Sequence, residues 1–86
     1  MPATNPRLNL HLLRAFFEVS RERSFSRAAG KLHVSQPAVS RAVRELESQV
    51  GLPLLERPGR GARELRLTEA GHALFEHARG IFALER

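Results

Sequence analysis

Apolar residues recur at helical spacing in four blocks of the chain. The first block covers residues 8 to about 22, and the second covers residues 26–32, where Ala28 and Ala29 are small. Apolar side chains three or four positions apart share one face of a helix, so both blocks predict helices that pack on a core. We expect Ser26 to cap the second helix, because a serine hydroxyl accepts a backbone N–H left unpaired at a helix start.

A tight turn at His33 and Val34 separates the second block from the third, which runs from residue 35 to about residue 50. Ser35 is expected to cap the third helix, and Pro37 is tolerated in the first turn, where a backbone N–H has no partner inside the helix. One face carries an apolar stripe, and the opposite face carries polar and cationic groups: Val39, Val43 and Leu46 against Gln36, Ser40, Arg41 and Arg44. A helix of this kind fits the major groove of DNA by its width.

Residues 52–67 predict a two-stranded hairpin after Gly51, since glycine commonly stands just past a helix end. Glycine and proline mark a turn between an apolar arm at 54–55 and an alternating arm at 64–67. Arginines beside glycine at a hairpin tip can enter a narrow minor groove, where negative potential is concentrated. The tip residues in question are Arg57, Arg60 and Arg63.

The last block, residues 68–86, predicts a helix that Thr68 caps, with Glu69 at its positive end. Its apolar side chains exceed what one small core needs. The predicted fold class is therefore mainly α with a small β-hairpin: a winged helix-turn-helix of three core helices and a wing, followed by one more helix. At 86 residues the chain has the size of one domain, which buries only about 60% of its unfolded surface.

Charge adds to this picture, because 14 basic residues face 9 acidic ones, and the net charge is +5. All but one of the basic residues are arginine, whose planar fork pairs well with phosphates and guanine edges. Residues 27–66 hold eight basic residues and four glutamates, so the middle of the chain is more basic than its flanks. Nucleic acid is the partner that this distribution favours.

Other chemistry finds little support in the sequence. His72 and His77 are five positions apart and do not share a helix face, and no aspartate or cysteine is present, so we expect no metal site and no cofactor. No nucleophile elbow, paired-carboxylate pattern or phosphate loop occurs, so we expect no enzyme. The chain has no export signal and no long apolar run, and a membrane-surface helix is a poor match. A cytoplasmic protein is expected.

The order Ala-Ala-x-x-Leu-x-x-Ser-Gln-Pro-Ala-Val-Ser-Arg, from Ala28 to Arg41, resembles the N-terminal DNA-binding domain of LysR-type transcriptional regulators. The likeness extends over most of the chain. It includes Leu13, Phe16, Val19, Ser24, Phe25, Leu46, Glu47, Gly51, Leu54, Arg57, Arg60, Leu67, Thr68, Ala70 and Gly71. The wing departs from the family pattern, because six residues, 61–66, stand where the family commonly has three.

The resemblance, together with the chemistry of these side chains, implies a role for each exposed group. We expect the base-reading residues to be Gln36, Pro37, Ala38 and Arg41, and the phosphate-binding residues to be Ser24, Ser26, Arg27, Ser35, Ser40 and Arg44. Which of Arg57, Arg60 and Arg63 enters the minor groove stays open, because the wing is longer. In the family the last helix is a linker that pairs with its two-fold mate, which here implies dimer contacts by Leu74, Phe75, Ala78, Ile81 and Phe82. The alternative is that Phe75 folds back on the first helix of its own chain.

The expected organisation is a loose tail at 1–7, a DNA-binding domain at 8–67 with its helix-turn-helix at about 26–50, and a linker helix at 68–86. Full-length family members carry an effector domain after the linker helix, so the resemblance implies that small-molecule sensing, and possible tetramer formation, belong to a part absent from this sequence. The expected activity is binding of a palindromic operator as a dimer. Two alternatives remain: a winged helix that contacts an acidic protein, and a nonspecific DNA-coating protein.

Overall fold

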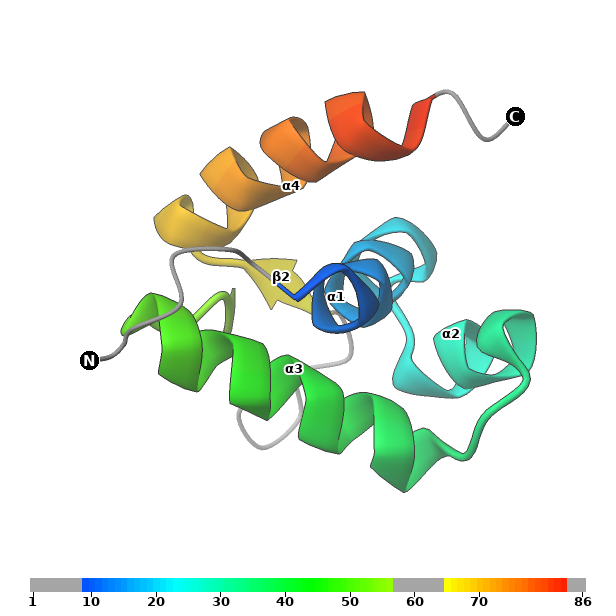
Figure 1. Cartoon of the computed structure of the whole chain (residues 1–86). Coiled ribbons are helices and arrows are strands. Elements are labelled where there is room, and N and C mark those ends of the chain that lie inside the picture. Colours follow the sequence, from blue (N-terminus) through cyan, green and yellow to red (C-terminus); the bar gives the residue numbers. More distant parts are fainter. Residues whose placement is uncertain (1–8, 57–64, 84–86) are drawn as a thin grey trace.

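The computed structural model describes residues 9–56 and 65–83. Helices α1 (Leu10–Glu22), α2 (Phe25–Leu32) and α3 (Gln36–Val50) pack on one another, and α4 (Glu69–Phe82) follows a short hairpin. Helix α1 lies between α3 and α4, so these two helices are on opposite sides of it (Figure 1). The fold is the expected winged helix-turn-helix with one additional helix.

The core forms where the apolar stripes predicted it. Phe16, Leu13 and Val19 of α1 are fully buried, and so are Val39, Val43 and Leu46 of α3. Ala28 and Ala29 are buried in α2, and their small side chains let the short helix approach its neighbours closely. The polar face of α3 is consequently held in place by the apolar face behind it.

Side-chain caps define where the helices start. Ser35 and Thr68 cap α3 and α4 as expected, but Ser24 rather than Ser26 caps α2: the backbone N–H of Arg27 donates to Ser24 Oγ at 3.0 Å. The expectation for Ser26 is wrong because Phe25 is already helical, which places Ser26 inside the first turn. The first helix starts at Leu10 rather than residue 8, because Asn9 Oδ1 accepts the N–H groups of His11 and Leu12.

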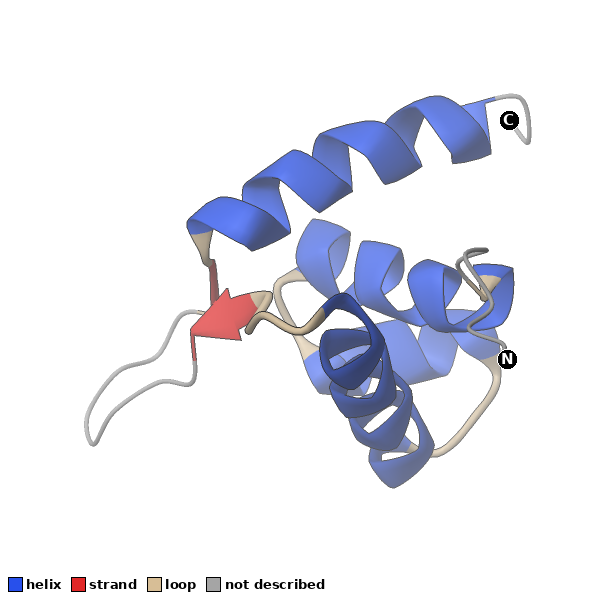
Figure 2. Cartoon of the chain, turned by 60° about the vertical axis from the view of Figure 1, so that its left-hand side comes forward, coloured by secondary structure: helices blue, strands red, loops and turns tan. Residues whose placement is uncertain are grey.

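The wing consists of β1 (Leu55–Glu56) and β2 (Arg66–Leu67), which pair antiparallel. Both strands lie beside the start of α4 (Figure 2). The alternation predicted for the second arm is present, since Leu65 is buried, Arg66 is exposed and Leu67 is half-buried. The arginines expected at the tip, Arg57, Arg60 and Arg63, lie outside the described residues.

Helix α4 packs along α1 of its own chain. The ring of Phe75 stacks on Phe17 with centroids 5.3 Å apart, and the Phe82 ring lies 5.1 Å from the same ring. Ala78 and Phe82 are buried in this contact, while Leu74 is half-buried and Ile81 is 40% exposed. Phe75, which is itself half-buried, thus contacts the first helix of its own chain, as the alternative expected. Dimer contacts by Leu74, Phe75, Ala78, Ile81 and Phe82 stay a prediction.

Candidate nucleic-acid interface

The outer face of α3 is the polar surface that the fold presents most directly to a partner. Gln36, Pro37, Arg41 and Arg44 are exposed, and Ala38 and Ser40 are half-buried. Val39 and Val43 of the same helix are buried toward the core, whereas Ala38 lies at the edge of this face, in a cleft that His11 and Arg14 of α1 also line. The structure thus brings together on one helix the four residues expected to read bases and two of those expected to hold phosphates.

The turn between α2 and α3 fixes the direction of this helix. His33 ends α2 in the left-handed conformation, with a φ of 59°, and the N–H of Val34 donates to the Ala29 carbonyl at 3.1 Å. Ser35 Oγ then accepts the Ala38 N–H at 3.2 Å and starts α3. A hydroxyl that accepts one hydrogen bond still has a proton to donate, so a capping serine can also bind a phosphate oxygen.

The start of α2 presents a second group of donors. Ser24 and Ser26 lie in or next to its first turn, and Arg27 is exposed there. Unpaired N–H groups and the helix dipole make such a start favourable for anions. Within residues 9–56 and 65–83, the arginines without an ion pair are Arg23, Arg27, Arg41, Arg44 and Arg66. Their charges are free to neutralise phosphates.

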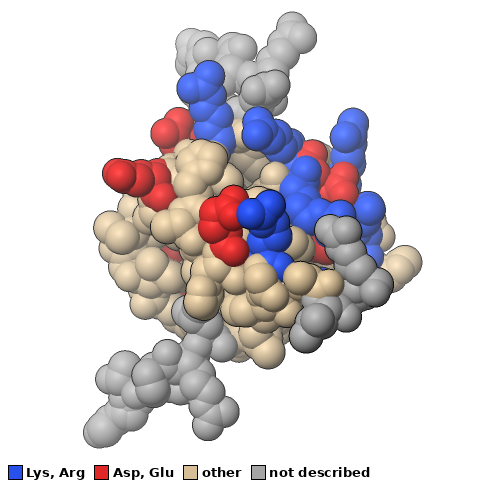
Figure 3. Space-filling model, turned by 90° about the horizontal axis from the view of Figure 1, so that it is seen from above, with Lys and Arg blue, Asp and Glu red and all other residues tan. Residues whose placement is uncertain are grey.

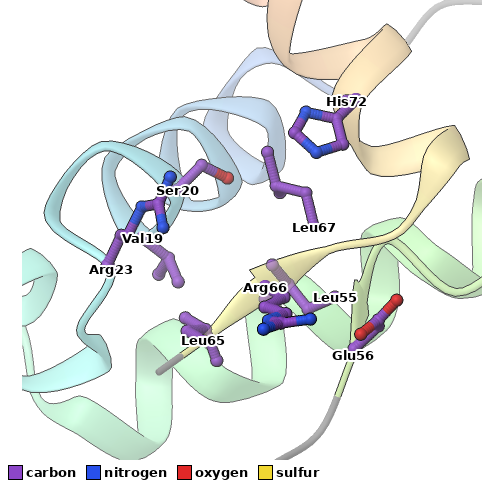
Figure 4. Close-up of a pocket in the computed structure, with 9 residues that line it drawn as sticks. All are labelled: Val19, Ser20, Arg23, Leu55, Glu56, Leu65, Arg66, Leu67 and His72. Carbon is purple, nitrogen blue, oxygen red and sulfur yellow. The ribbon is translucent and has the colours of Figure 1, made fainter. Parts of the chain in front are cut away.

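Two of these arginines were not predicted as site residues. Arg23 ends α1 in the left-handed conformation, with a φ of 55°, and Arg66 lies on β2. Both line a cleft of about 310 Å³ between the end of α1, the wing and the start of α4, together with His72 (Figure 4). The left-handed conformation of Arg23 is uncommon for a non-glycine residue, but it is visible only in the structure, so the sequence did not single this residue out.

The base of the wing is tied to both neighbouring helices. Glu47 Oε2 on α3 accepts the backbone N–H groups of Leu54 at 2.8 Å and of Leu55 at 3.2 Å. Thr68 Oγ1 donates to the Pro53 carbonyl at 2.7 Å and accepts the Gly71 N–H at 2.9 Å. Hydrogen bonds to a carboxylate are stronger than neutral ones, so Glu47 sets where the wing leaves α3. The sequence does not indicate this role for Glu47.

The opposite face of the molecule has a different charge pattern. Seen from the side that α4 covers, acidic groups stand among the basic ones (Figure 3). On α4 itself Arg79 pairs with Glu76, and on α1 Glu18 pairs with Arg14 and Arg21. A phosphate backbone is better matched by the unpaired arginines of α2 and α3 than by these paired ones.

A metal site and a membrane span were also looked for in the described part of the chain. No group of three or more histidine, cysteine, aspartate or glutamate residues there is placed to hold a metal ion. None of the helices within that part has the length and apolar character needed to cross a bilayer.

Fold and surface together define a winged helix-turn-helix domain with a linker-like fourth helix. The model of the bacterial regulatory helix-turn-helix proteins of the lysR family matches residues 10–72. The chain belongs to this family. The resemblance inferred from the Ala-Ala and Ser-Gln-Pro residues is confirmed.

Individual relatives are similar over most of this chain. The RuBisCO operon transcriptional regulator of Allochromatium vinosum is 49% identical over 74 residues, which cover 86% of this chain and 24% of that protein. The regulator BudR of Klebsiella aerogenes is 48% identical over 77 residues, which cover 90% of this chain and 52% of that protein. The chain thus spans about a quarter to a half of the length of these two relatives.

Solved structures give the same family. The DNA-binding domain of BenM, in complex with the catB site 1 DNA, has a TM-score of 0.79 and 39% identity, and covers 87% of this chain and 80% of that one. The DNA complex of the CbnR DNA-binding domain has a TM-score of 0.78 and 40% identity, over 90% and 85% of the two chains.

Proposed function

We propose that this domain binds double-stranded DNA sequence-specifically, as the reading head of a LysR-type transcriptional regulator. The observation that carries the proposal is the outer face of α3, where base-reading donors and arginines without ion pairs among the described residues stand on a helix fixed from behind by the core. The similar domains of BenM and CbnR were solved with DNA, which supports the same partner here.

Helix α3 would lie in the major groove with its first turns at the base edges. Gln36 can make two hydrogen bonds to adenine, Arg41 can reach guanine, and Pro37 and Ala38 can contact a thymine methyl. Ser24, Ser26, Arg27, Ser35, Ser40 and Arg44 would hold phosphates, which fixes register without choosing sequence. Arg23 joins this second group because it adjoins Ser24 and has no ion pair among the described residues.

The wing would supply the minor-groove contact. Its base is fixed between α3 and α4 by Glu47 and Thr68. Arg57, Arg60 and Arg63 remain our candidates for insertion, because a narrow minor groove attracts arginine.

The domain would act as a homodimer on a palindromic operator. The candidate contacts with a second copy are those of α4, where Ile81 is exposed and Leu74 and Phe75 are half-buried, while Ala78 and Phe82 are buried within the single chain. In the whole regulator, we propose that effector sensing and any tetramer belong to sequence outside this chain. Its compartment would be the cytoplasm, where the operator is.

Selection from a random duplex pool tests this function. The domain is incubated with the pool, the bound fraction is amplified over several rounds, and the winners are sequenced. We expect an interrupted palindrome. If the bound duplexes keep random sequences, the activity is nonspecific coating of DNA. If the domain binds no duplex at all, the result favours the alternative that it contacts an acidic protein.

A further inference from the structure

Glu18 carries the only buried carboxylate on α1, and this carboxylate takes no part in the DNA-binding surface that we propose on α3. The residue is 7% exposed, and its Oε1 atom has no hydrogen-bond partner within the described residues. Its Oε2 atom lies 3.9 Å from Arg14 Nη1 and 3.7 Å from Arg21 Nη1. Because a buried charge is costly unless it is compensated, Glu18 holds both arginines close to α1.

The same two arginines lie against aromatic rings. The Arg14 guanidinium carbon is 4.1 Å from the centroid of Phe82 on α4, and the Arg21 guanidinium carbon is 5.5 Å from the centroid of Phe17 on α1. Cations over ring faces are attracted by the ring quadrupole. Phe17 in turn stacks on Phe75 at an interplanar angle of 22°. One continuous set of contacts therefore runs from Glu18 to helix α4.

These contacts matter because α4 is held at two places. Thr68 ties its first turn to Pro53 at the wing, and the rings of Phe75 and Phe82 hold the rest of the helix along α1. A helix fixed at one end changes its direction when the contact farther along it loosens. The contacts of Phe75 and Phe82 with α1 are therefore suited to fix the angle between α4 and the rest of the domain.

We infer that Glu18 is a positioning residue for the linker helix. Glu18 keeps Arg14 on the ring of Phe82 and Arg21 on the ring of Phe17. It thereby sets the angle between α4 and the three-helix core. Its consequence for DNA rests on the function proposed above: in a dimer joined through α4, this angle sets the separation of half-sites that two heads can occupy together.

A distance measurement without DNA tests the positioning role directly. The chain has no cysteine, so spin labels can be attached at Ser48→Cys on α3 and Gly80→Cys on α4, both of them exposed. A Cβ atom at position 80 would meet no atom within 4 Å outside the neighbouring backbone of its own helix. Labelled chains are diluted with unlabelled ones so that only distances within one chain are recorded. We expect one narrow distance distribution.

Glu18→Gln keeps the shape of the side chain and removes its charge. We expect this variant to broaden or shift the distance distribution while its circular dichroism still shows a folded helical domain. The matched control is Glu22→Gln one turn later on α1, where the lost ion pair joins Lys31 of α2 at 3.4 Å. This control should reproduce the starting distribution. An unchanged distribution in Glu18→Gln, or an equal change in both variants, would overturn the inference.

A second readout uses DNA with two half-sites at varied separation. We expect Glu18→Gln to lower the preference for the best separation over its neighbours by about two- to fivefold, the factor that one cation–π contact contributes to an equilibrium. Preference equal to that of Glu22→Gln would contradict the role of α4 in spacing. If even the unmodified domain shows no preferred separation, the proposed two-headed function fails, and the distance result without DNA still decides the positioning role.

Discussion

Substitutions of single side chains on the outer face of α3 should weaken DNA binding in different ways. A glutamine that pairs with a base edge contributes only when the right base is there, whereas an arginine on a phosphate contributes on every sequence. We propose that Gln36 is of the first kind and Arg44 of the second, and both are exposed on the same helix. Their loss should consequently produce different binding phenotypes.

Gln36→Ala is expected to lose about 1–3 kcal/mol of binding free energy on the selected operator and almost none on bulk DNA, because only the base contact is removed. Fluorescence anisotropy titrations of both duplexes measure this difference. Equal losses on the two duplexes would show that Gln36 does not read a base.

Arg44→Ala is expected to weaken binding to all duplexes and to flatten the plot of log affinity against log salt by about one unit, since one phosphate is no longer neutralised. Titrations at four or more salt concentrations give the slope. An unchanged slope would remove Arg44 from the phosphate-binding group.

At the scale of elements, the start of α4 approaches the backbone before the wing closely. Gly71 is buried there, and a Cβ atom at this position would overlap the carbonyl oxygen of Leu54. That carbonyl also accepts the N–H of Thr68 at 3.0 Å, so it cannot easily move. Gly80 lies on the same helix with no atom near its Cβ position.

Gly71→Ala should therefore lower the free energy of unfolding by about 1–3 kcal/mol, through overpacking against backbone. Gly80→Ala should raise it by about 0.4–1 kcal/mol, because alanine restricts the unfolded chain and favours a helix. Urea unfolding followed by circular dichroism measures both. Equal effects of the two substitutions would refute the close approach at Gly71.

The sequence was sufficient to predict most of these elements. Spacing and caps predicted α1 to α4 and the wing, because apolar stripes and serine or threonine caps act within a few residues of chain. The cap at Ser24 was missed by two positions, since Ser26 offers the same hydroxyl in the same neighbourhood. Residue types alone did not separate the two serines.

The parts that were not predicted depend on contacts between segments distant in sequence. The ties from Glu47 to the wing and the ring contacts of Phe17 with Phe75 and Phe82 arise only after the helices have packed. A stripe of apolar residues on α4 is equally compatible with a partner and with the chain's own α1. The structure shows the contact with α1, and the contact with a second copy stays a prediction.

For the molecule as a whole, α3, which we propose contacts DNA, and α4, which we propose contacts a second copy, lie on opposite sides of α1 (Figure 1). Two copies joined through the free flank of α4 would present two α3 helices to one duplex. Both heads can bind together only when the half-sites face the same side of DNA.

Insertion of five base pairs between the half-sites turns one of them by about half a turn of the duplex. We expect affinity to fall by about a hundredfold or more, because the advantage of two linked heads is lost. Insertion of ten base pairs restores the facing and is the control for length. An affinity that the five-base-pair insertion leaves unchanged would indicate that only one domain of the dimer contacts the duplex.

The central claim is that this domain recognises a sequence and not only the charge of DNA. Its most direct test is the ratio of affinities for the selected duplex and for a shuffled duplex of equal composition, measured at two salt concentrations. We predict a ratio of about a thousand or more that persists while both affinities fall with salt. A ratio near one at both salt concentrations would contradict the claim.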